Sequence, residues 1–243
     1  MRNRESLPSR AVTATIHLHP TAPLAERVLL PGDPGRALLL AQLLLDAPKM
    51  FNHNRGLWGY TGAAADGDPL TVQSTGMGGP SAAIVISELA DLGARRLVRV
   101  GTCGALGQTL TLGQVVIATD ALAADGCSRA LGAGERVPAS AELLAALRSA
   151  ADGQAIIGVV ASTDLFYDDR GDPEREWLAA GALAVEMETA TLFAMAAQRG
   201  LQAGSVLIVT DVLFPARSRI DELELRAAEH RVGALAAAAL LDT

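Results

Sequence analysis

Apolar segments of strand length alternate with segments of helical length along most of this 243-residue chain. The strand-like segments are rich in Val, Ile and Leu, which is typical of strands buried on both sides of a sheet. Strands that alternate with helices need crossover connections, and such connections build a mainly parallel sheet with helices on both faces. The sequence therefore predicts a single α/β domain with three layers, α/β/α, around a central mixed, mainly parallel sheet.

The periodicity also predicts where the elements lie. The expected strands are Val28–Leu30, Leu70–Ser74, Arg96–Val100, Val115–Thr119, Ile156–Ala161, Leu183–Met187 and Val206–Thr210. The expected helices are Arg36–Leu45, Ser81–Leu92, Ser140–Ala150, Glu188–Arg199 and Asp221–Leu241. We expect residues 1–15 to form a loose N-terminal tail, residues 16–243 to form the domain, and Ala121–Ala139 to form a mobile surface loop.

The composition fits this fold and excludes several classes of protein. Half of the residues are hydrophobic but only 3% are aromatic, so the core must be built from aliphatic side chains. The net charge of −7 argues against a nucleic-acid partner, and no apolar run is long enough to cross a membrane. Cys103 and Cys127 have no metal-ligand spacing and form no disulfide framework, and the first sixteen residues lack the apolar block of a signal peptide. We therefore expect a cytoplasmic protein.

The stretch PGDPGR, residues 31–36, separates an apolar strand from an apolar helix. In α/β sheets, ligands bind beyond the carboxyl ends of the strands. Gly32 and Gly35 allow the backbone to approach a ligand closely, and N–H groups at the start of a helix can hold an anion. Arg36 adds positive charge in the first helical turn, where it opposes the helix dipole. The pattern indicates either an anion site or a tight turn with a solvated arginine.

Arg99 lies inside an apolar segment that should be a buried central strand. A lone buried arginine is costly unless an anion or a carboxylate pairs with it. We expect Thr102 just beyond the strand end, where its hydroxyl could donate to the same anion. Arg36 and Arg99 together would suit a phosphate, whereas the plainer alternative for Arg99 is a structural salt bridge.

A third strand end carries the glycine-rich stretch GMGGP, residues 76–80. Its spacing does not match the G-x-G-x-x-G fingerprint of dinucleotide-binding proteins, which disfavours a nicotinamide-dependent dehydrogenase. Met77 lies between the glycines, where it either contacts an apolar face of a ligand or simply packs against the protein.

Acidic residues mark two further strand ends. Glu186 and Glu188 alternate along a short strand and point to one face, where a carboxylate could bind two neighbouring hydroxyls such as those of ribose. The alternative for Glu188 is stabilisation of a helix N-terminus. Thr210 and Asp211 end a strongly apolar strand, and Asp211 is there a candidate proton donor or, alternatively, a helix cap.

Six motifs in this order resemble the hexameric nucleoside phosphorylase family, which contains bacterial purine nucleoside phosphorylases and uridine phosphorylases. They are PGDPGR, RGLWGYTG, STGMGGPSAAIVISEL, RVGTCGAL, STDLFY and VEMETATL. The resemblance extends over nearly the whole chain from Ile16. It implies that inorganic phosphate is the co-substrate, that no metal or organic cofactor is needed, and that the protein is a homo-oligomer, expected as a hexamer built as a trimer of dimers.

The resemblance also assigns roles to residues of the phosphate site. The family's phosphate-binding positions match Gly32, Arg36, Arg99 and Thr102. Arg55 matches an arginine that reaches the phosphate of a neighbouring subunit. We therefore expect active sites that are shared between subunits.

The nucleoside site is assigned in the same way. His17 matches a histidine that reaches the ribose 5′-hydroxyl of the neighbouring subunit, and His19 is the competing choice. Glu188 matches the carboxylate that binds the 2′- and 3′-hydroxyls, and Phe166 matches an aromatic residue that stacks on the base. Our candidate nucleoside-binding residues are His17, Met77, Phe166, Glu186, Met187, Glu188 and Thr210.

The choice between purine and pyrimidine depends on a few residues. Asp211 matches the general acid of the purine branch, and Arg226 matches, across a short insertion, the arginine that assists it. Arg170 and Asp172 stand where uridine phosphorylases would have the glutamine and arginine that read uracil, although STGMGGPS is closer to the uridine branch. We expect phosphorolysis of purine nucleosides, in which Asp211 protonates N7. A uridine phosphorylase is the alternative, and a hydrolytic nucleosidase or a non-catalytic nucleoside-binding protein is more distant.

Overall fold

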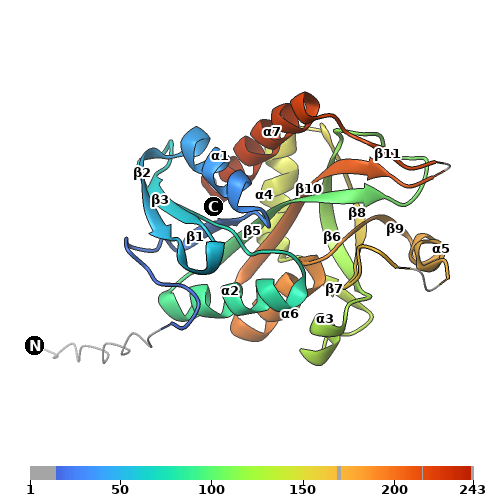
Figure 1. The fold of residues 1–243 in the computed structure, drawn as a ribbon, viewed down its shortest axis with the longest axis horizontal. Coiled ribbons are helices and arrows are strands. Elements are labelled where there is room, and N and C mark those ends of the chain that lie inside the picture. The colour runs from blue at the N-terminus through green and yellow to red at the C-terminus, as the bar shows by residue number, and fades with distance from the viewer. Residues whose placement is uncertain (1–14, 169–170, 215, 242–243) are drawn as a thin grey trace, which may run out of the picture.

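The structure, a computed structural model, describes residues 15–168, 171–214 and 216–241 (Figure 1). Almost all of the predicted tail, residues 1–15, lies outside these residues. The described chain forms one mixed sheet with helices on both of its faces, which confirms the predicted fold class. None of its helices is both long enough and apolar enough to cross a membrane.

The elements follow the predicted alternation closely. The strands are β1 (Arg27–Leu30), β2 (Asp46–Asn52), β3 (Gly59–Ala63), β4 (Pro69–Gln73), β5 (Arg96–Ala105), β6 (Val115–Ala123), β7 (Arg136–Pro138), β8 (Ala155–Ser162), β9 (Ala182–Glu186), β10 (Gln202–Val212) and β11 (Ser218–Arg219). The helices are α1 (Pro34–Leu44), the 3₁₀ helix η1 (Asn54–Gly56), α2 (Gly79–Leu92), α3 (Gly126–Ala130), α4 (Ala141–Ala151), α5 (Pro173–Ala179), α6 (Thr189–Arg199) and α7 (Glu222–Leu241).

The sheet closes on itself at one end. Strand β10 pairs with both β5 and β6, and β9 pairs with both β5 and β8. Because β6 also pairs with β8, these five strands form a closed ring. Strands β1, β4, β3 and β2 extend from β5 as an open wing. The alternation of strands and helices predicts helices on two faces but does not reveal this closure.

Two aliphatic cores lie on opposite faces of the sheet. One is formed with α2 and α6 and contains Val85 and Leu97, and the other is formed with α1, α4 and α7 and contains Leu40 and Val98. Leu97 and Val98 are neighbours in β5, so the alternation of the strand places successive side chains in different cores. This alternation decides which functional side chains of β5 face which helices.

The register of β5 sets the level of the candidate site. Leu30, the last residue of β1, pairs with Arg99, and β5 then continues to Ala105. Strand β10 runs parallel to β5 and places Asp211 beside Gly104. Strand β9 runs antiparallel to β5, so its carboxyl end returns toward Arg99. Arg99 therefore lies beside the ends of β1 and β9 although it is in the middle of its own strand.

One sequence prediction about local structure is wrong, and two strands of the open wing were missed. Ala121–Ala139 is not a loop, because it contains the end of β6, the helix α3 and the strand β7. Asp125 caps α3 by accepting the Ser128 N–H at 2.7 Å, and β7 pairs with β6. Strands β2 and β3 were not predicted. The first five residues of β2 are exposed and include Asp46, Pro48 and Lys49, so they lack the apolar pattern that indicates a buried strand.

Candidate active site

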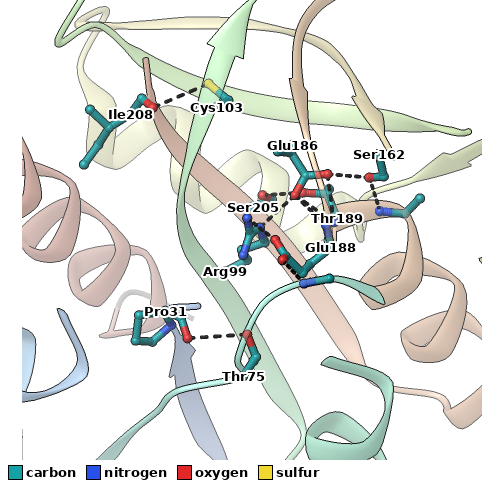
Figure 2. A network of polar contacts seen from close by, with 12 residues as sticks. Pro31, Thr75, Arg99, Cys103, Ser162, Glu186, Glu188, Thr189, Ser205 and Ile208 are labelled. Carbon is teal, nitrogen blue, oxygen red and sulfur yellow. Dashed lines mark hydrogen bonds and ion pairs between the residues drawn. The ribbon is translucent and has the colours of Figure 1, made fainter. Parts of the chain in front are cut away.

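A buried arginine joins three segments of the chain at the centre of the site (Figure 2). The Arg99 side chain is 6% exposed and folds along β5 over Gly101, where an added Cβ would lie 2.7 Å from its Cζ. Its Nε donates to Glu186 Oε2 at 2.9 Å, and its Nη2 lies 2.5 Å from Glu188 Oε2. Burial alone would lower the pKa of Arg99, but the charges of Glu188 and Glu186 outweigh it, so the pKa is raised and the guanidinium stays charged.

Glu186 has a structural role in this cluster. Its side chain is fully buried and accepts hydrogen bonds from the Ser162 hydroxyl and from the backbone N–H groups of Glu188 and Thr189. Those two N–H groups begin α6, so the carboxylate also stabilises the helix N-terminus. Glu186 therefore does not face a nucleoside here, contrary to the sequence prediction, because its oxygens are closed off from solvent.

Glu188 faces a small cavity. The cavity is lined by Arg99, Glu188 and Thr75 together with apolar side chains of β1, α2 and α6. Glu188 Oε1 also accepts the N–H of Gly78, which has a φ of 83° that favours glycine. Burial raises the pKa of Glu188, Arg99 opposes this shift, and the nearby Glu186 carboxylate adds to it. Glu188 is thus an acceptor whose ionised form is held mainly by Arg99.

The glycine-rich turns meet beside Arg99. A Cβ at Gly32 would lie 3.3 Å from the Gly76 carbonyl oxygen and 4.0 Å from Arg99 Nη1. Asp33 caps α1 by accepting the backbone N–H of Arg36 at 2.6 Å. The structure therefore brings the PGDPGR turn and the GMGGP turn together next to the buried guanidinium.

Arg36 is held by a carboxylate that the sequence analysis missed. Its Nε donates to Glu229 Oε1 at 2.7 Å, and Glu229 belongs to the buried face of α7. The signal in the sequence is a glutamate among the apolar residues Ala228 and Val232. Arg36 also lies close enough to Glu188 to oppose the rise in the pKa of that carboxyl group.

Thr102 was predicted to follow the end of the strand, and this is wrong. Strand β5 continues to Ala105, so Thr102 lies within it. Thr102 alternates with Val98 and Val100, which belong to the core formed with α1 and α7. It therefore shares a face of the sheet with α1, whereas Arg99 lies on the face covered by α2 and α6.

The residues predicted to serve a neighbouring subunit lie next to each other. The His17 ring Nδ1 is 2.7 Å from Glu88 Oε1, and the Asn54 side-chain amide donates to the His17 carbonyl at 2.9 Å. Arg55 follows Asn54 in η1 and has a φ of 58°. His19 points elsewhere, because its ring Nε2 is 3.2 Å from the Ile16 carbonyl. Asn52 Oδ1 accepts the N–H groups of both His19 and Asn54, so the segment that carries Arg55 lies beside both histidines.

Asp211 lies at the opposite end of the site from Arg99. It is 6% exposed, its Oδ2 accepts the Thr210 hydroxyl at 3.0 Å, and its Oδ1 accepts Nη2 and Nε of Arg217 at 3.0 and 3.2 Å. The Arg217 Cζ also lies 5.1 Å from the centre of the Phe166 ring. Arg217 thus links Phe166 to Asp211, and Asp211 also contacts Thr210.

Arg226 does not contact Asp211. It lies on the exposed surface of α7 and pairs with Glu222 at 2.9 Å, one helical turn away. The expected contact is made by Arg217 instead, because the turn after β10 brings this residue back to the end of the strand. Nothing in the sequence distinguishes Arg217 from the other arginines of this segment.

The remaining predicted residues lie around the rim or outside the described chain. Met77 is 87% exposed and Met187 is half-buried. Asp172 pairs with Arg175 at 2.6 Å near the start of α5, and Arg170 lies outside the described residues. The Cys103 thiol is buried, which raises its pKa and makes it inert. The described residues contain no group of three or more His, Cys, Asp or Glu that could hold a metal ion.

Comparison with known proteins gives a consistent result. The phosphorylase superfamily matches residues 26–243. The DeoD-type purine nucleoside phosphorylase of Alkaliphilus metalliredigens is 39% identical over 197 residues, which cover 79% of this chain and 84% of that protein. The protein of the same name from Caldanaerobacter subterraneus is 40% identical, with 78% and 84% covered. The one from Geobacillus kaustophilus is 40% identical, with 79% and 83% covered.

The attachment of residues 16–18 to α2 should depend on pH. Burial tends to raise the pKa of Glu88, but hydrogen bonds from the Leu18 N–H, the His17 ring and the His17 N–H outweigh it and lower the pKa. A lowered pKa in the folded state means that the attachment is fully present above the ordinary glutamate pKa and is lost as pH falls through the folded value. Hydrogen exchange, corrected for its intrinsic pH dependence, should show residues 16–18 losing protection below about pH 4.

Glu88→Gln should weaken this protection at neutral pH and remove its pH dependence. Asp91→Asn is the matched control, because it removes one carboxylate from the same helix without touching residues 16–18. Equal protection at all pH values, or an equal effect of the control, would contradict the role of Glu88.

Proposed function

The chain belongs to the phosphorylase superfamily, and on that premise we propose that it catalyses the phosphorolysis of purine nucleosides. The products are the free base and ribose 1-phosphate or deoxyribose 1-phosphate. The relatives reported above, 39–40% identical, bear the name purine nucleoside phosphorylase, and Asp211 provides the acid that purine release requires. A uridine phosphorylase is therefore not favoured.

The observation that carries the proposal is the distance along the sheet between Arg99 and Asp211. The Arg99 guanidinium lies over Gly101, and Asp211 pairs with Gly104. Three residues of strand correspond to about 10 Å, which is roughly the length of a nucleoside. The phosphate and ribose would lie near Arg99 and Glu188, and the base would lie between Asp211 and Phe166. A pure binding protein would not need a carboxylic acid at the base end.

The chemistry follows from these positions. Arg36 uses Nε for Glu229, and Arg99 uses Nε and Nη2 for Glu186 and Glu188, so their other N–H groups are available to phosphate. The C1′–N9 bond breaks and its electron pair moves to the base, while a phosphate oxygen forms the new bond to C1′. Asp211 gives its proton to N7, which neutralises the leaving base. Phosphate stabilises the positive charge that develops on the ribose.

Such a reaction needs no metal or organic cofactor, because phosphate is the nucleophile and a side chain supplies the proton. Its products fit purine salvage. The free cysteines Cys103 and Cys127 fit the reducing cytoplasm in which we place the protein.

The site is completed by a neighbouring subunit in a homo-oligomer, expected as a hexamer built as a trimer of dimers. Arg36 and Arg99 bring two positive charges, whereas Glu186, Glu188 and Glu229 bring three negative ones. A phosphate dianion therefore needs another cation, and Arg55 of a second copy supplies it. The grouping of Arg55 with His17 supports this arrangement, because one contact would then deliver both residues to the neighbouring site.

Phosphate should be essential for base release. Incubation with inosine, adenosine and uridine, with and without phosphate, should give purine bases and a ribose 1-phosphate, and omission of phosphate should slow base release by about 100-fold or more. Equal rates without phosphate would indicate hydrolysis. Preferential cleavage of uridine would indicate the uridine branch.

Two inactive variants should restore each other's activity. Asp211→Asn should lose about 10²–10⁴-fold on inosine because it cannot donate a proton, and Arg55→Ala should lose its phosphate contact. If Arg55 acts in a neighbouring site, random pairing of the two proteins gives one intact site in each mixed dimer, or about a quarter of the wild-type activity. Steady-state assays after subunit exchange measure this.

The matched control is a mixture of Arg36→Ala with Asp211→Asn. Both of these residues belong to one site of one subunit, so no mixed dimer has an intact site. Equal recovery in this control, or no recovery in the first mixture despite proven exchange, would contradict the shared site.

A further inference from the structure

The Arg217 side chain makes two contacts at the base end of the site. Its Nη2 and Nε donate to Asp211 Oδ1 at 3.0 and 3.2 Å, and its Cζ lies 5.1 Å from the centre of the Phe166 ring. The guanidinium therefore bridges the candidate acid and the candidate stacking residue. The side chain is 48% exposed, so no packed core holds it in this place.

A guanidinium and a planar base would compete for the same face of the Phe166 ring. Phe166 is 54% exposed; its ring makes a T-shaped contact with Tyr167, at 4.9 Å between ring centres, and the Arg217 guanidinium lies over its face. Arginine over an aromatic face makes a cation–π contact where a stacked base would otherwise lie. A base that stacks on this face must therefore displace Arg217.

The same displacement changes what Asp211 can do. An oxygen that accepts two N–H groups from a guanidinium has no proton to offer at that position. When Arg217 leaves, Oδ1 can take up a proton from solvent and share it with an acceptor on the base. Occupation of the Phe166 face and release of the Asp211 oxygen are thus linked through one side chain.

We infer that Arg217 is a specificity-determining residue that closes the base site of the free enzyme and is displaced by an incoming purine. This inference rests on the proposed function, because it assumes that the base lies between Phe166 and Asp211. A planar aromatic base replaces both contacts of the guanidinium, one by stacking and one by hydrogen bonding to Asp211. A ligand that reaches this end of the site without a planar base would displace the guanidinium without this compensation.

The test compares the wild type with Arg217→Gln and with the control Arg219→Gln. Arg219 is exposed in β11 and its substitution removes the same charge two residues away. Calorimetry with hypoxanthine as the probe should show a dissociation constant about 5-fold lower for Arg217→Gln, as expected when weak, exposed contacts no longer compete. The control should bind hypoxanthine like the wild type.

Kinetics separate this role from direct assistance to the acid. For phosphorolysis of inosine, Arg217→Gln should lower KM by a similar factor and so raise kcat/KM, whereas Arg219→Gln should leave both constants unchanged. Unchanged or weaker binding of hypoxanthine, or a fall in kcat at constant KM, would overturn the inference. If the wild type itself releases no base from inosine and phosphate, the proposed function fails instead, so the two failures are distinguishable.

Discussion

The arrangement of the site depends on the pairing of one buried arginine with two buried glutamates. Arg99 lies in the middle of β5, Glu186 ends β9, and Glu188 precedes α6. A buried charge without a partner is very costly, so these three segments are held together wherever the chain is folded. Because Leu30 pairs with Arg99, the same interaction fixes the level at which the PGDPGR turn meets the site. The positions that we propose for phosphate and ribose follow from this cluster.

The two glutamates differ in their roles: Glu186 stabilises the fold, and Glu188 is our candidate ligand-binding residue. Glu186 uses its oxygens for Arg99, Ser162 and the start of α6, whereas Glu188 lines the cavity. The parallel pairing of β5 with β10 then places the acid, Asp211, at a fixed distance from the arginine. Near Asp211, the half-exposed Arg217 side chain bridges this carboxylate to Phe166. In the site that we propose, the phosphate end is thus held by buried ion pairs, and the base end is held by one half-exposed side chain.

The sequence predicts features that depend on local pattern and misses those that depend on geometry. Arg99 stands out because a charge interrupts an apolar strand, and the turn at Gly32 stands out because glycines separate two apolar segments. The position of Thr102 was wrong because nothing in the pattern shows that β5 continues past the end of β1. Arg226 was chosen over Arg217 because the path of the turn after β10 cannot be read from residue types. The closure of the sheet could not be predicted from the sequence for the same reason.

The most direct test of the account compares Glu186→Gln with Glu188→Gln by chemical denaturation and by kcat/KM for inosine. Glu186→Gln should lower the free energy of unfolding by about 3 kcal/mol or more, since it breaks a fully buried ion pair. Glu188→Gln should lower it less, because Glu186 still pairs with Arg99 and the glutamine side-chain oxygen can still accept the Gly78 N–H. It should nevertheless lower kcat/KM about 10- to 100-fold. The opposite pattern, with Glu188 stabilising the fold and Glu186 governing turnover, would contradict the account.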